Sequence, residues 1–352
     1  MMSEFERKER VISTDLSKEH WYAVEKLGSL KGGILKITLM DQDIIIYRHS
    51  GNELVALEDR CAHRHIPLSR FGRLSSDRLI CRYHGWSYDH HGTCTHIPLH
   101  PRGVERFSPP PGIRSYPVAA KYGLIWIFPG NAILAGTTEL PVIERLEDPS
   151  ITSAIVDETF DAHHSQVMEN FCDLYHEKLH ERYQPFINST LIHYKTKPDG
   201  LDILYDTQFS RGLFLKYFLK DFKKNTRVLL DYSYPHLSLD FEGKQELWIF
   251  IIPVRQNRTR VLAFFLSEFV IPFTGITMPR WLSRPITATL ASLYSRTFTR
   301  EDRVVLKYET ESLSKHKGKP YYEVNPVVPE LRRIMIEKDG KMHNAQVHVS
   351  EK

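Results

Sequence analysis

Two short motifs pair a cysteine with a histidine: Cys61-Ala62-His63 and Cys81-Arg82-Tyr83-His84. Thiolates suit iron–sulfur clusters and zinc, whereas imidazoles suit iron and zinc. Two cysteines on one iron and two histidines on the other would hold a [2Fe–2S] cluster with a higher reduction potential than an all-cysteine cluster. A structural zinc site is the alternative, but zinc sites rarely use the one-residue spacing of the first motif. The motifs therefore predict a cluster bound by Cys61, His63, Cys81 and His84.

A second group of ligand-type residues lies in the segment NFCDLYHEKLH, which begins at Asn170. If the segment is helical, Asp173, His176 and His180 fall on one face, because successive residues turn by about 100°. Two imidazoles at positions i and i+4 can bind one metal ion. They supply two corners of the two-histidine, one-carboxylate site typical of non-haem Fe(II) oxygenases. A solvated, histidine-rich helix face is the alternative.

The segment His176–His180 also matches the H-E-x-x-H motif of zinc proteases, in which Glu177 would be the general base. The extended form of that motif requires a glycine and a third histidine, where this chain has Tyr183 and Phe186. A protease would also have no use for the upstream cysteine–histidine motifs. The protease interpretation is therefore disfavoured.

The segments CAHRHIPLS and CRYHGWSYD resemble the cluster-binding loops of the Rieske family, and the resemblance covers roughly residues 20–130. The four residues named above as cluster ligands take the ligand positions of that family. Respiratory Rieske proteins carry a further cysteine in each loop, and the two form a disulfide; this chain has no such pair. Cys94 lies beyond the second loop and is expected to be an ordinary strand or turn residue. The loops therefore resemble those of the oxygenase or ferredoxin kind.

The second segment is similar to part of the catalytic domain of Rieske oxygenases, with Asn170 preceding the candidate ligands in the same order. The spacing from His176 to His180 is one residue shorter than is common in that family. The resemblance implies a carboxylate as the third iron ligand, on a C-terminal helix. Asp302 is the candidate, in a segment that resembles the start of the family's helix, and Glu301 is the alternative.

The resemblance implies a terminal oxygenase that uses O2 and two electrons to hydroxylate, demethylate or otherwise oxidise an apolar or aromatic small molecule. Its cofactors would be a [2Fe–2S] cluster and a mononuclear Fe(II). It would form a homotrimer in which the cluster of one subunit faces the iron of the next. Asp173 would then link the cluster ligand His84 to His176 by hydrogen bonds, an arrangement that orients metal ligands.

The sequence has no G-x-G-x-x-G fingerprint of a flavin or NAD site following a strand. Electrons are therefore expected from a separate reductase, directly or through a ferredoxin. Chain length and the catalytic segment favour a monooxygenase over a ring-hydroxylating dioxygenase. A Rieske electron carrier without mononuclear iron is a further alternative, but it would need only the first of the two domains.

Two differently built domains are predicted to position these ligands. Residues 20–130 contain short strand-like runs separated by turns, as in a small antiparallel β domain. Residues 131–345 are α+β: strands between Leu201 and Phe269 are flanked by a helix from Asp161 to about Tyr183 and another from Arg280 to about Lys315. Together with the resemblance, this predicts an all-β Rieske domain followed by a helix-grip catalytic domain.

The side chains of this predicted sheet would build an apolar cavity, although the same residues also suit a plain core. The aromatic candidates are Tyr205, Phe209, Phe214, Phe218, Trp248 and Phe250. His163 and His164 precede the candidate iron ligands on the predicted helix and are expected at the surface.

The composition excludes several classes of protein. The chain has 352 residues, of which 41% are hydrophobic, and a formal net charge of +4 without a long Lys/Arg block, so nucleic acid is not an expected partner. No apolar run approaches the length of a membrane span. The charged start MMSEFERKER lacks the apolar region of a secretory signal, which favours the cytoplasm. The apolar stretch from Phe264 to Trp281 could line a substrate entrance or touch a membrane surface.

Overall fold

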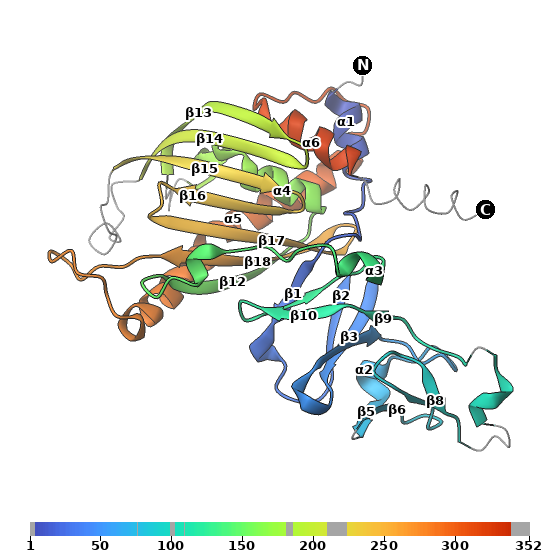
Figure 1. The fold of residues 1–352 in the computed structure, drawn as a ribbon. Coiled ribbons are helices and arrows are strands. Elements are labelled where there is room, and N and C mark those ends of the chain that lie inside the picture. Colours follow the sequence, from blue (N-terminus) through green and yellow to red (C-terminus); the bar gives the residue numbers. More distant parts are fainter. Residues whose placement is uncertain are drawn as a thin grey trace. The chain divides into compact units, whose positions relative to one another are not determined.

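The computed structural model describes residues 4–75, 77–98, 103–108, 110–180, 186–209 and 224–338. The chain divides into two compact units, Lys18–Leu140 and Met1–Ser17 together with Pro141–Lys352 (Figure 1). Among the helices of the described residues, none combines the length and the apolar character needed to cross a membrane.

The unit Lys18–Leu140 consists of three small sheets of antiparallel strands, in the orders β1-β11-β10, β2-β3-β4-β9 and β5-β6-β7-β8. The strands are β1 (Tyr22–Lys26), β2 (Leu35–Leu39), β3 (Gln42–Arg48), β4 (Leu54–Glu58), β5 (Gly72–Ser75), β6 (Arg78–Cys81), β7 (Ser87–Tyr88), β8 (Cys94–His96), β9 (Ser115–Tyr116), β10 (Val118–Lys121) and β11 (Leu124–Ile127). The short helices are α2 (Leu68–Phe71) and α3 (Ala132–Ala135). The prediction of an all-β N-terminal region is confirmed.

The core of this unit holds the two cysteines of the ligand motifs. Alternate residues of β3 and β4 point to one face, as the two-residue period of a strand requires. The resulting cluster includes Ile45, Tyr47, Val55, Leu57, Cys61 and Cys81. The thiols are thus fixed by the packed core, and the rest of each ligand loop extends from it.

The second unit is built on one antiparallel sheet of seven strands, in the order β12-β18-β17-β16-β15-β14-β13. Its strands are β12 (Thr152–Phe160), β13 (Phe186–Lys197), β14 (Gly200–Phe209), β15 (Asn225–Ser233), β16 (His236–Phe241), β17 (Gln245–Arg255) and β18 (Arg258–Ser267). The helices are α1 (Glu4–Val11), α4 (His164–Cys172), α5 (Arg280–Lys315) and α6 (Val327–Glu337). Helices α4 and α5 lie across one face of the sheet, and α1 lies beside α6 (Figure 1).

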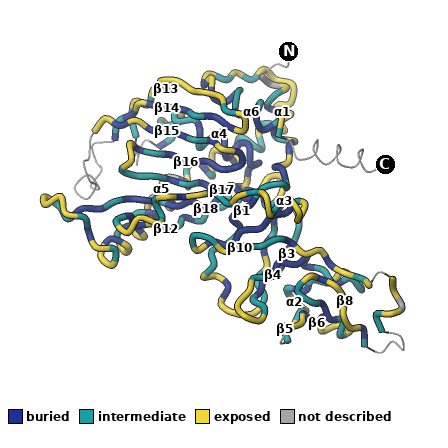
Figure 2. Tube along the Cα trace, in the orientation of Figure 1, coloured by how far each residue is buried: buried dark blue, intermediate teal, exposed yellow. Residues whose placement is uncertain are grey.

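The burial pattern of the sheet explains why its central strands were recognisable. Buried positions alternate with intermediate ones along most of β14 and with exposed ones along most of β15, whereas β17 and β18 are buried along most of their length (Figure 2). The predicted strands between Leu201 and Phe269 and the predicted helix Arg280–Lys315 are all present. The predicted α+β class, with a sheet gripping a long helix, is confirmed.

The predicted helix from Asp161 to Tyr183 is wrong in extent. Helix α4 covers only His164–Cys172, and the segment Leu174–His180 is a tighter 3-10 helix. Asp173 between them is extended, with φ −101° and ψ 97°. Residues 181–185 lie outside the described residues.

His163 and His164, expected at the surface, are buried. Nε2 of both rings lies within hydrogen-bonding distance of the carbonyl oxygen of Thr14, at 3.1 and 3.2 Å. The prediction failed because the residues that cover these rings come from the chain's N-terminus, far away in the sequence.

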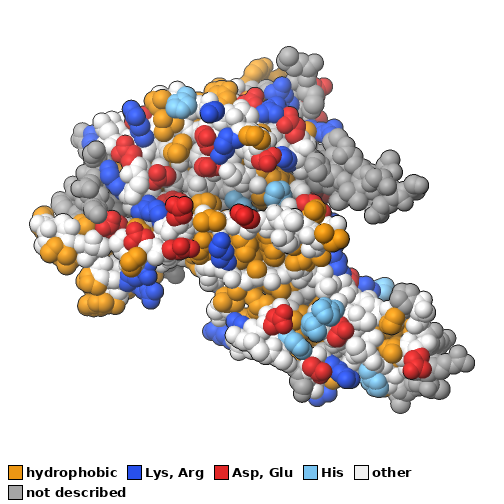
Figure 3. All heavy atoms as spheres, viewed as in Figure 1, with side chains coloured by type: hydrophobic (Ala, Val, Ile, Leu, Met, Phe, Trp, Pro, Cys, Tyr) orange, Lys and Arg blue, Asp and Glu red, His pale blue; other side chains and the backbone are white. Residues whose placement is uncertain are grey.

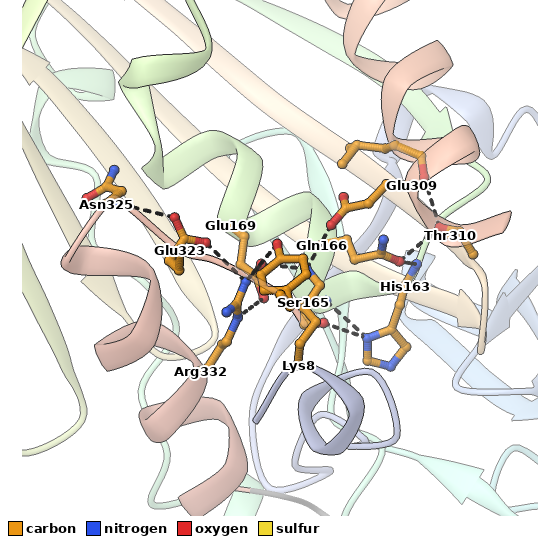
Figure 4. A network of polar contacts seen from close by, with 12 residues as sticks. Lys8, His163, Ser165, Gln166, Glu169, Glu309, Thr310, Glu323, Asn325 and Arg332 are labelled. Carbon is orange, nitrogen blue, oxygen red and sulfur yellow. Dashed lines mark hydrogen bonds and ion pairs between the residues drawn. The ribbon is translucent and has the colours of Figure 1, made fainter. Parts of the chain in front are cut away.

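The N-terminal helix α1 is tied to α4 and α6 by a buried ionic network (Figure 4). Nζ of Lys8 lies 2.7 Å from the carboxylate of Glu169, and Nη2 of Arg332 approaches the same carboxylate to 2.8 Å. Lys8 also pairs with Glu309 on α5 at 3.0 Å. Burial disfavours the charged form of Glu169, but the two cations outweigh it and lower the pKa of this carboxyl. Residues 1–17 thus belong structurally to the second unit.

The surface carries charges of both signs. On the face drawn in Figure 3, Lys and Arg side chains are interspersed with Asp and Glu. The charges drawn on this face are thus mixed rather than grouped by sign.

Candidate metal centres

The two cysteine–histidine motifs form loops with the same backbone hydrogen bonds. The N–H of Cys61 donates to the carbonyl of Ile66, and the N–H of Cys81 donates to that of Trp86. Each cysteine carbonyl in turn accepts from the residue four positions later, His65 or Gly85, at 2.8 Å. The motifs are therefore two copies of one loop.

The residue four positions after each cysteine has a left-handed backbone, with φ of 56° at His65 and 73° at Gly85. A Cβ on Gly85 would lie 2.6 Å from Cγ of Pro98, so glycine is required in the second loop. His65 is exposed and meets no such neighbour, which explains why a larger residue is tolerated there at a modest backbone cost.

The four candidate cluster ligands converge, with the thiols inside and the imidazoles outside. Cys61 and Cys81 are buried, His63 is half-buried and His84 is exposed. The rings of His63 and His84 are 4.6 Å apart, and Trp86 stacks on His63 at 4.9 Å. Nδ1 of His63 is buried and has no hydrogen-bond partner in the described part of the chain. A buried imidazole nitrogen without a partner, on a ring next to a second imidazole, fits a cluster with mixed ligands.

Backbone and tyrosine donors surround the thiols. Burial raises the pKa of Cys81, and the neighbouring thiol of Cys61 adds to this, whereas the N–H groups of Tyr83 and His84 oppose it. The Tyr88 hydroxyl accepts from the N–H of Ala62 at 2.9 Å and lies 3.2 Å from Sγ of Cys61, to which it can donate. Such donors stabilise thiolates and sulfides. Sequence reasoning missed this role for Tyr88, although the residue lies inside the matched segment CRYHGWSYD.

All four cysteines are among the described residues, and none forms a disulfide. Cys94 lies at the start of β8 and is buried, as expected of an ordinary strand residue. Burial raises the pKa of its thiol to about 11.

The second ligand group lies at the C-terminal end of α4, next to α5. The Asp173 carboxylate accepts from the N–H of Tyr175 at 2.9 Å, a local turn that competes with helix continuation. His176 and His180 then follow on the 3-10 segment, so they do not share the single α-helical face predicted from their spacing. Asp302 is in the interior of the 36-residue helix α5, so the expectation of a helix start at this residue is wrong.

Ligand-type atoms of His176, His180 and Asp302 all lie within 4.8 Å of one another. Oδ1 of Asp302 is 3.5 Å from Nε2 of His176 and 3.3 Å from Nε2 of His180. Asn170 also donates to this oxygen, at 3.3 Å. His180 and Asp302 are buried, and His176 is partly exposed. Two imidazoles and one carboxylate form the donor set typical of non-haem iron.

The outward nitrogen of each imidazole is occupied. Nδ1 of His180 lies 2.9 Å from the Glu301 carboxylate, and Nδ1 of His176 contacts the carbonyl oxygen of Asp173. These acceptors place the ring protons on Nδ1 and leave both Nε2 lone pairs facing Asp302, as a metal ligand requires. Glu301, the alternative iron ligand, thus lies on the far side of His180.

Asp173 meets His176 differently from the expected arrangement. Its carbonyl oxygen, not its carboxylate, faces the ring. The carboxylate accepts from Tyr175 and from Nδ2 of Asn325, the latter at 2.7 Å. Asn325 also donates to the hydroxyl of Tyr205 at 2.9 Å. No sequence motif pointed to Asn325, because it precedes α6 and reaches Asp173 only through the fold.

Glu177 is engaged in a structural role. Its carboxylate accepts from the N–H groups of Asn188 and Ser189, each at 3.0 Å. These bonds fasten the 3-10 segment to β13 and argue against Glu177 as the general base of a zinc protease.

A long apolar cavity extends from the three ligands between the sheet and α5. Helix α5 lines it with Thr287, Leu290, Ala291, Thr299 and Asp302, and β18 lines it with Val261, Ala263, Phe265 and Ser267. Thr287, Leu290 and Ala291, and likewise Thr299 and Asp302, are three or four residues apart, and the two groups face the cavity from one side of the helix. Thr287 and Asp302 are separated by about 22 Å along the axis, at about 1.5 Å per residue. Of the four predicted aromatic candidates within the described residues, only Phe209 lines the cavity; Phe214 and Phe218 lie outside them.

Comparison with known proteins agrees with both centres. Residues 20–117 match the family model of the Rieske [2Fe-2S] domain. The chain is 36% identical over 340 residues to the 4beta-methylsterol monooxygenase of Methylococcus capsulatus, covering 95% of this chain and 92% of that protein. It is 33% identical over 156 residues to the oxygenase component of dicamba O-demethylase of Stenotrophomonas maltophilia, covering 44% and 45% of the two chains. The crystal structure of dicamba monooxygenase bound to dicamba superposes with a TM-score of 0.74 at 20% identity, covering 95% of this chain and all of that one.

The chain therefore belongs to the Rieske non-haem iron oxygenases. It is an enzyme of this family, with a [2Fe–2S] cluster and a mononuclear iron as cofactors, and its relatives are monooxygenases and demethylases of small molecules. Some of these relatives are named as subunits or components of multicomponent oxygenase systems.

Proposed function

We propose that Cys61, His63, Cys81 and His84 hold the cluster and that His176, His180 and Asp302 hold the iron. The support is geometric: each set converges, and the outward imidazole nitrogens of the second set are already occupied. In this proposal residues 20–130 are the cluster domain and residues 131–345 the iron domain.

The iron, when bound, supplies a centre that takes up an electron and activates O2. The protein's contribution is to orient and protect this centre. Glu301 and the Asp173 carbonyl fix the planes and tautomers of His180 and His176. Asn170 donates to Asp302 and so holds one carboxylate oxygen in place. The apolar walls of the cavity exclude water from one side of the site.

The substrate we propose is an elongated, largely apolar polycyclic molecule of the methylsterol kind, oxidised at a methyl group by monooxygenation. The residues of α5 that line the cavity extend over about 22 Å, which exceeds what a single aromatic ring needs. Its lining from β12, β16, β17 and β18 is mainly aliphatic and aromatic. The 4beta-methylsterol monooxygenase matches nearly the whole chain, which favours this class over a smaller aromatic acid. The long apolar cavity ending at the three ligands is the observation that carries the proposal.

The proposed assembly is a homotrimer fed with electrons by a reductase, directly or through a ferredoxin. In it, Asp173 carries the link between His84 of one subunit and His176 of the next. Its carboxylate is held by Asn325 on one side. We place the enzyme in the cytoplasm at a membrane surface, since a methylsterol-like substrate is dissolved in lipid.

The test uses the purified holoenzyme with a reductase and O2. Methylsterols should be converted to oxidised products, with substrate-dependent O2 consumption, whereas methoxybenzoates and methylxanthines should not be. His176→Ala should retain the cluster spectrum and lose the mononuclear iron and turnover; His193→Ala, an exposed histidine on β13, is the control. Turnover of the small aromatics but not of methylsterols would reject the substrate class, and full iron content in His176→Ala would reject the ligand assignment.

A further inference from the structure

The connection between β18 and α5, residues 268–279, forms a small hairpin. Val270 and Thr277 form an isolated antiparallel bridge, and the N–H of Ile271 donates to the carbonyl of Ile276 at 2.8 Å. Its tip uses left-handed backbone at Phe273, φ 66°, and Gly275, φ 70°. We name residues 268–279 the β18–α5 hairpin.

One side of the β18–α5 hairpin closes the end of the cavity remote from the iron ligands. Phe269 and Met278 are buried against each other, with Ile286 and Leu290 of α5 packed on them. Phe269 and Leu290 also line the cavity. The hairpin base is therefore a wall of the cavity about 20 Å from Asp302, judged from the rise along α5.

The other side exposes large apolar side chains to solvent. Phe273 is 94% exposed, Ile276 62% and Trp281, in the first turn of α5, 77%. Hydrophobic side chains gather on this projecting part at the left of Figure 3, with charged side chains of both signs near them. Solvated exposure of this much apolar surface is unfavourable, and such patches mark interaction sites.

The charge of the hairpin and the first turns of α5 indicates which kind of partner would bind there. Residues 269–290 contain two arginines, Arg280 and Arg284, and no Asp or Glu. Arg284 is exposed, and Arg280 donates to the backbone carbonyls of Ile151 and Asp148. Apolar side chains and a tryptophan next to cationic residues are the combination that inserts into the interface of an anionic bilayer. A projecting tip is also suited to penetration between headgroups.

We propose that the β18–α5 hairpin and the first turns of α5 dock on an anionic lipid surface and admit the substrate from it. The exposed side would enter the lipid interface while the buried side forms the adjoining cavity end. A lipid-dissolved molecule would then reach the iron ligands by moving along α5 without crossing water. The part of the inference that concerns substrate uptake rests on the proposed substrate class. The docking itself rests only on the exposure and the charge of the hairpin and the first turns of α5.

Flotation of the full-length holoenzyme with vesicles tests the docking. Vesicles of phosphatidylcholine with one quarter phosphatidylglycerol should bind the protein at least tenfold better than phosphatidylcholine alone. Phe273→Ser with Trp281→Ser, and separately Arg284→Glu, should each reduce this binding about tenfold or more. Ile133→Ser on α3, 80% exposed in the other unit, is the matched control and should bind as the wild type does.

Two further measurements separate the possible failures. The ratio of methylsterol turnover from vesicles to turnover from cyclodextrin should fall about tenfold in Phe273→Ser with Trp281→Ser. Vesicle binding without methylsterol turnover would sustain the docking while rejecting the proposed substrate. Absence of vesicle binding by the wild type, or equal binding by all variants, would overturn the docking. A change of oligomeric state in the hairpin variants by sedimentation would overturn it too, by assigning the face to a second copy of the chain.

Discussion

Glu301 and Asp302 lie on opposite sides of the His180 imidazole. Oε2 of Glu301 is 2.9 Å from Nδ1, whereas Oδ1 of Asp302 is 3.3 Å from Nε2. Two neighbouring carboxylates on one helix can therefore have separate tasks. Glu301 orients the imidazole, and Asp302 is positioned to bind the metal together with His180. Sequence alone left these two residues as alternatives.

Substituting these carboxylates should separate the two tasks. Asp302→Asn should lose the mononuclear iron, because a carboxylate ligand is removed. Glu301→Gln should keep the iron with an affinity reduced by about 10–100-fold, as expected for a partner that orients a ligand. Titration of the iron-depleted protein with Fe(II) measures both. The reverse order of effects would make Glu301 the ligand.

Iron binding should depend on pH through His180. Burial disfavours the charged ring, but hydrogen bonds and charges from Asp302 and Glu301 outweigh it and raise the pKa of His180. Because only the neutral ring binds iron, affinity should rise with pH up to this raised pKa, with proton release on binding. In the iron-free chain, the stability of the fold depends on the pKa of His180 with the opposite sign. Protonated His180 stabilises the fold fully below its unfolded pKa, and this contribution is lost as pH rises through the folded pKa.

Glu301→Gln provides the control for this pH dependence. Removing its charge should lower the pKa of His180 and move the midpoint of the iron-affinity profile to lower pH. A midpoint unchanged between wild type and Glu301→Gln would show that another group governs the profile.

Loss of one cluster ligand should abolish the visible chromophore and all activity. Cys61→Ser and His84→Ala each remove one of four ligands. Cys94→Ala is the matched control, since Cys94 is equally buried but lies in β8 outside the two loops. It should retain the oxidised cluster spectrum. A normal spectrum in Cys61→Ser would contradict the assignment.

Asp173→Asn should keep both metals and slow electron transfer from cluster to iron. The metals stay because the Asp173 carbonyl, which the substitution preserves, orients His176. In the proposed trimer the substitution removes the charged acceptor for His84 of the next subunit, which weakens a charge-assisted hydrogen bond. Single-turnover kinetics with a pre-reduced cluster measure the rate. Rapid cluster oxidation in the variant, with substrate and O2 present, would reject the link.

The buried ionic network should be a major contributor to stability. Glu169→Gln leaves Lys8 and Arg332 without their shared carboxylate and should reduce the free energy of unfolding by about 3–5 kcal/mol. Glu337→Gln on α6, which breaks an exposed pair with Arg333, should cost about 0.3–0.5 kcal/mol. Denaturant unfolding of the two variants gives the comparison. Equal losses would mean that the buried network contributes no more than the exposed pair.

The features that could be predicted from the sequence are those that depend on the spacing of nearby residues. The cluster loops are short and self-contained, so ligand types and order were sufficient to find them. The strands from β14 to β18 were recognisable from their period and turns. The spacing of His176 and His180 suggested one helix face, yet a turn at Asp173 ends α4 before either residue.

What escaped prediction depends on contacts between distant segments. Asn325 acts on Asp173 from 152 positions away, and β12 and α1 find their places only in the folded unit. His163 and His164 resemble surface residues until the chain's N-terminus covers them. Asp302 could be proposed as a ligand from its place in the family pattern. The sequence could not assign different roles to Asp302 and Glu301, because this depends on where His180 lies between them.

The ionic bonds of α1 also bear on synthesis of the chain at the ribosome. Lys8 is made before its partners, which lie on α4 and α5, and before Arg332 on α6, which shares Glu169 with it. Domains generally fold as units, in the order in which they are made. The unit Lys18–Leu140 can therefore fold and acquire its cluster before the residues that hold α1 in place have been made. Helix α1 is made before α4, α5 and α6 and can be fixed in place only after them.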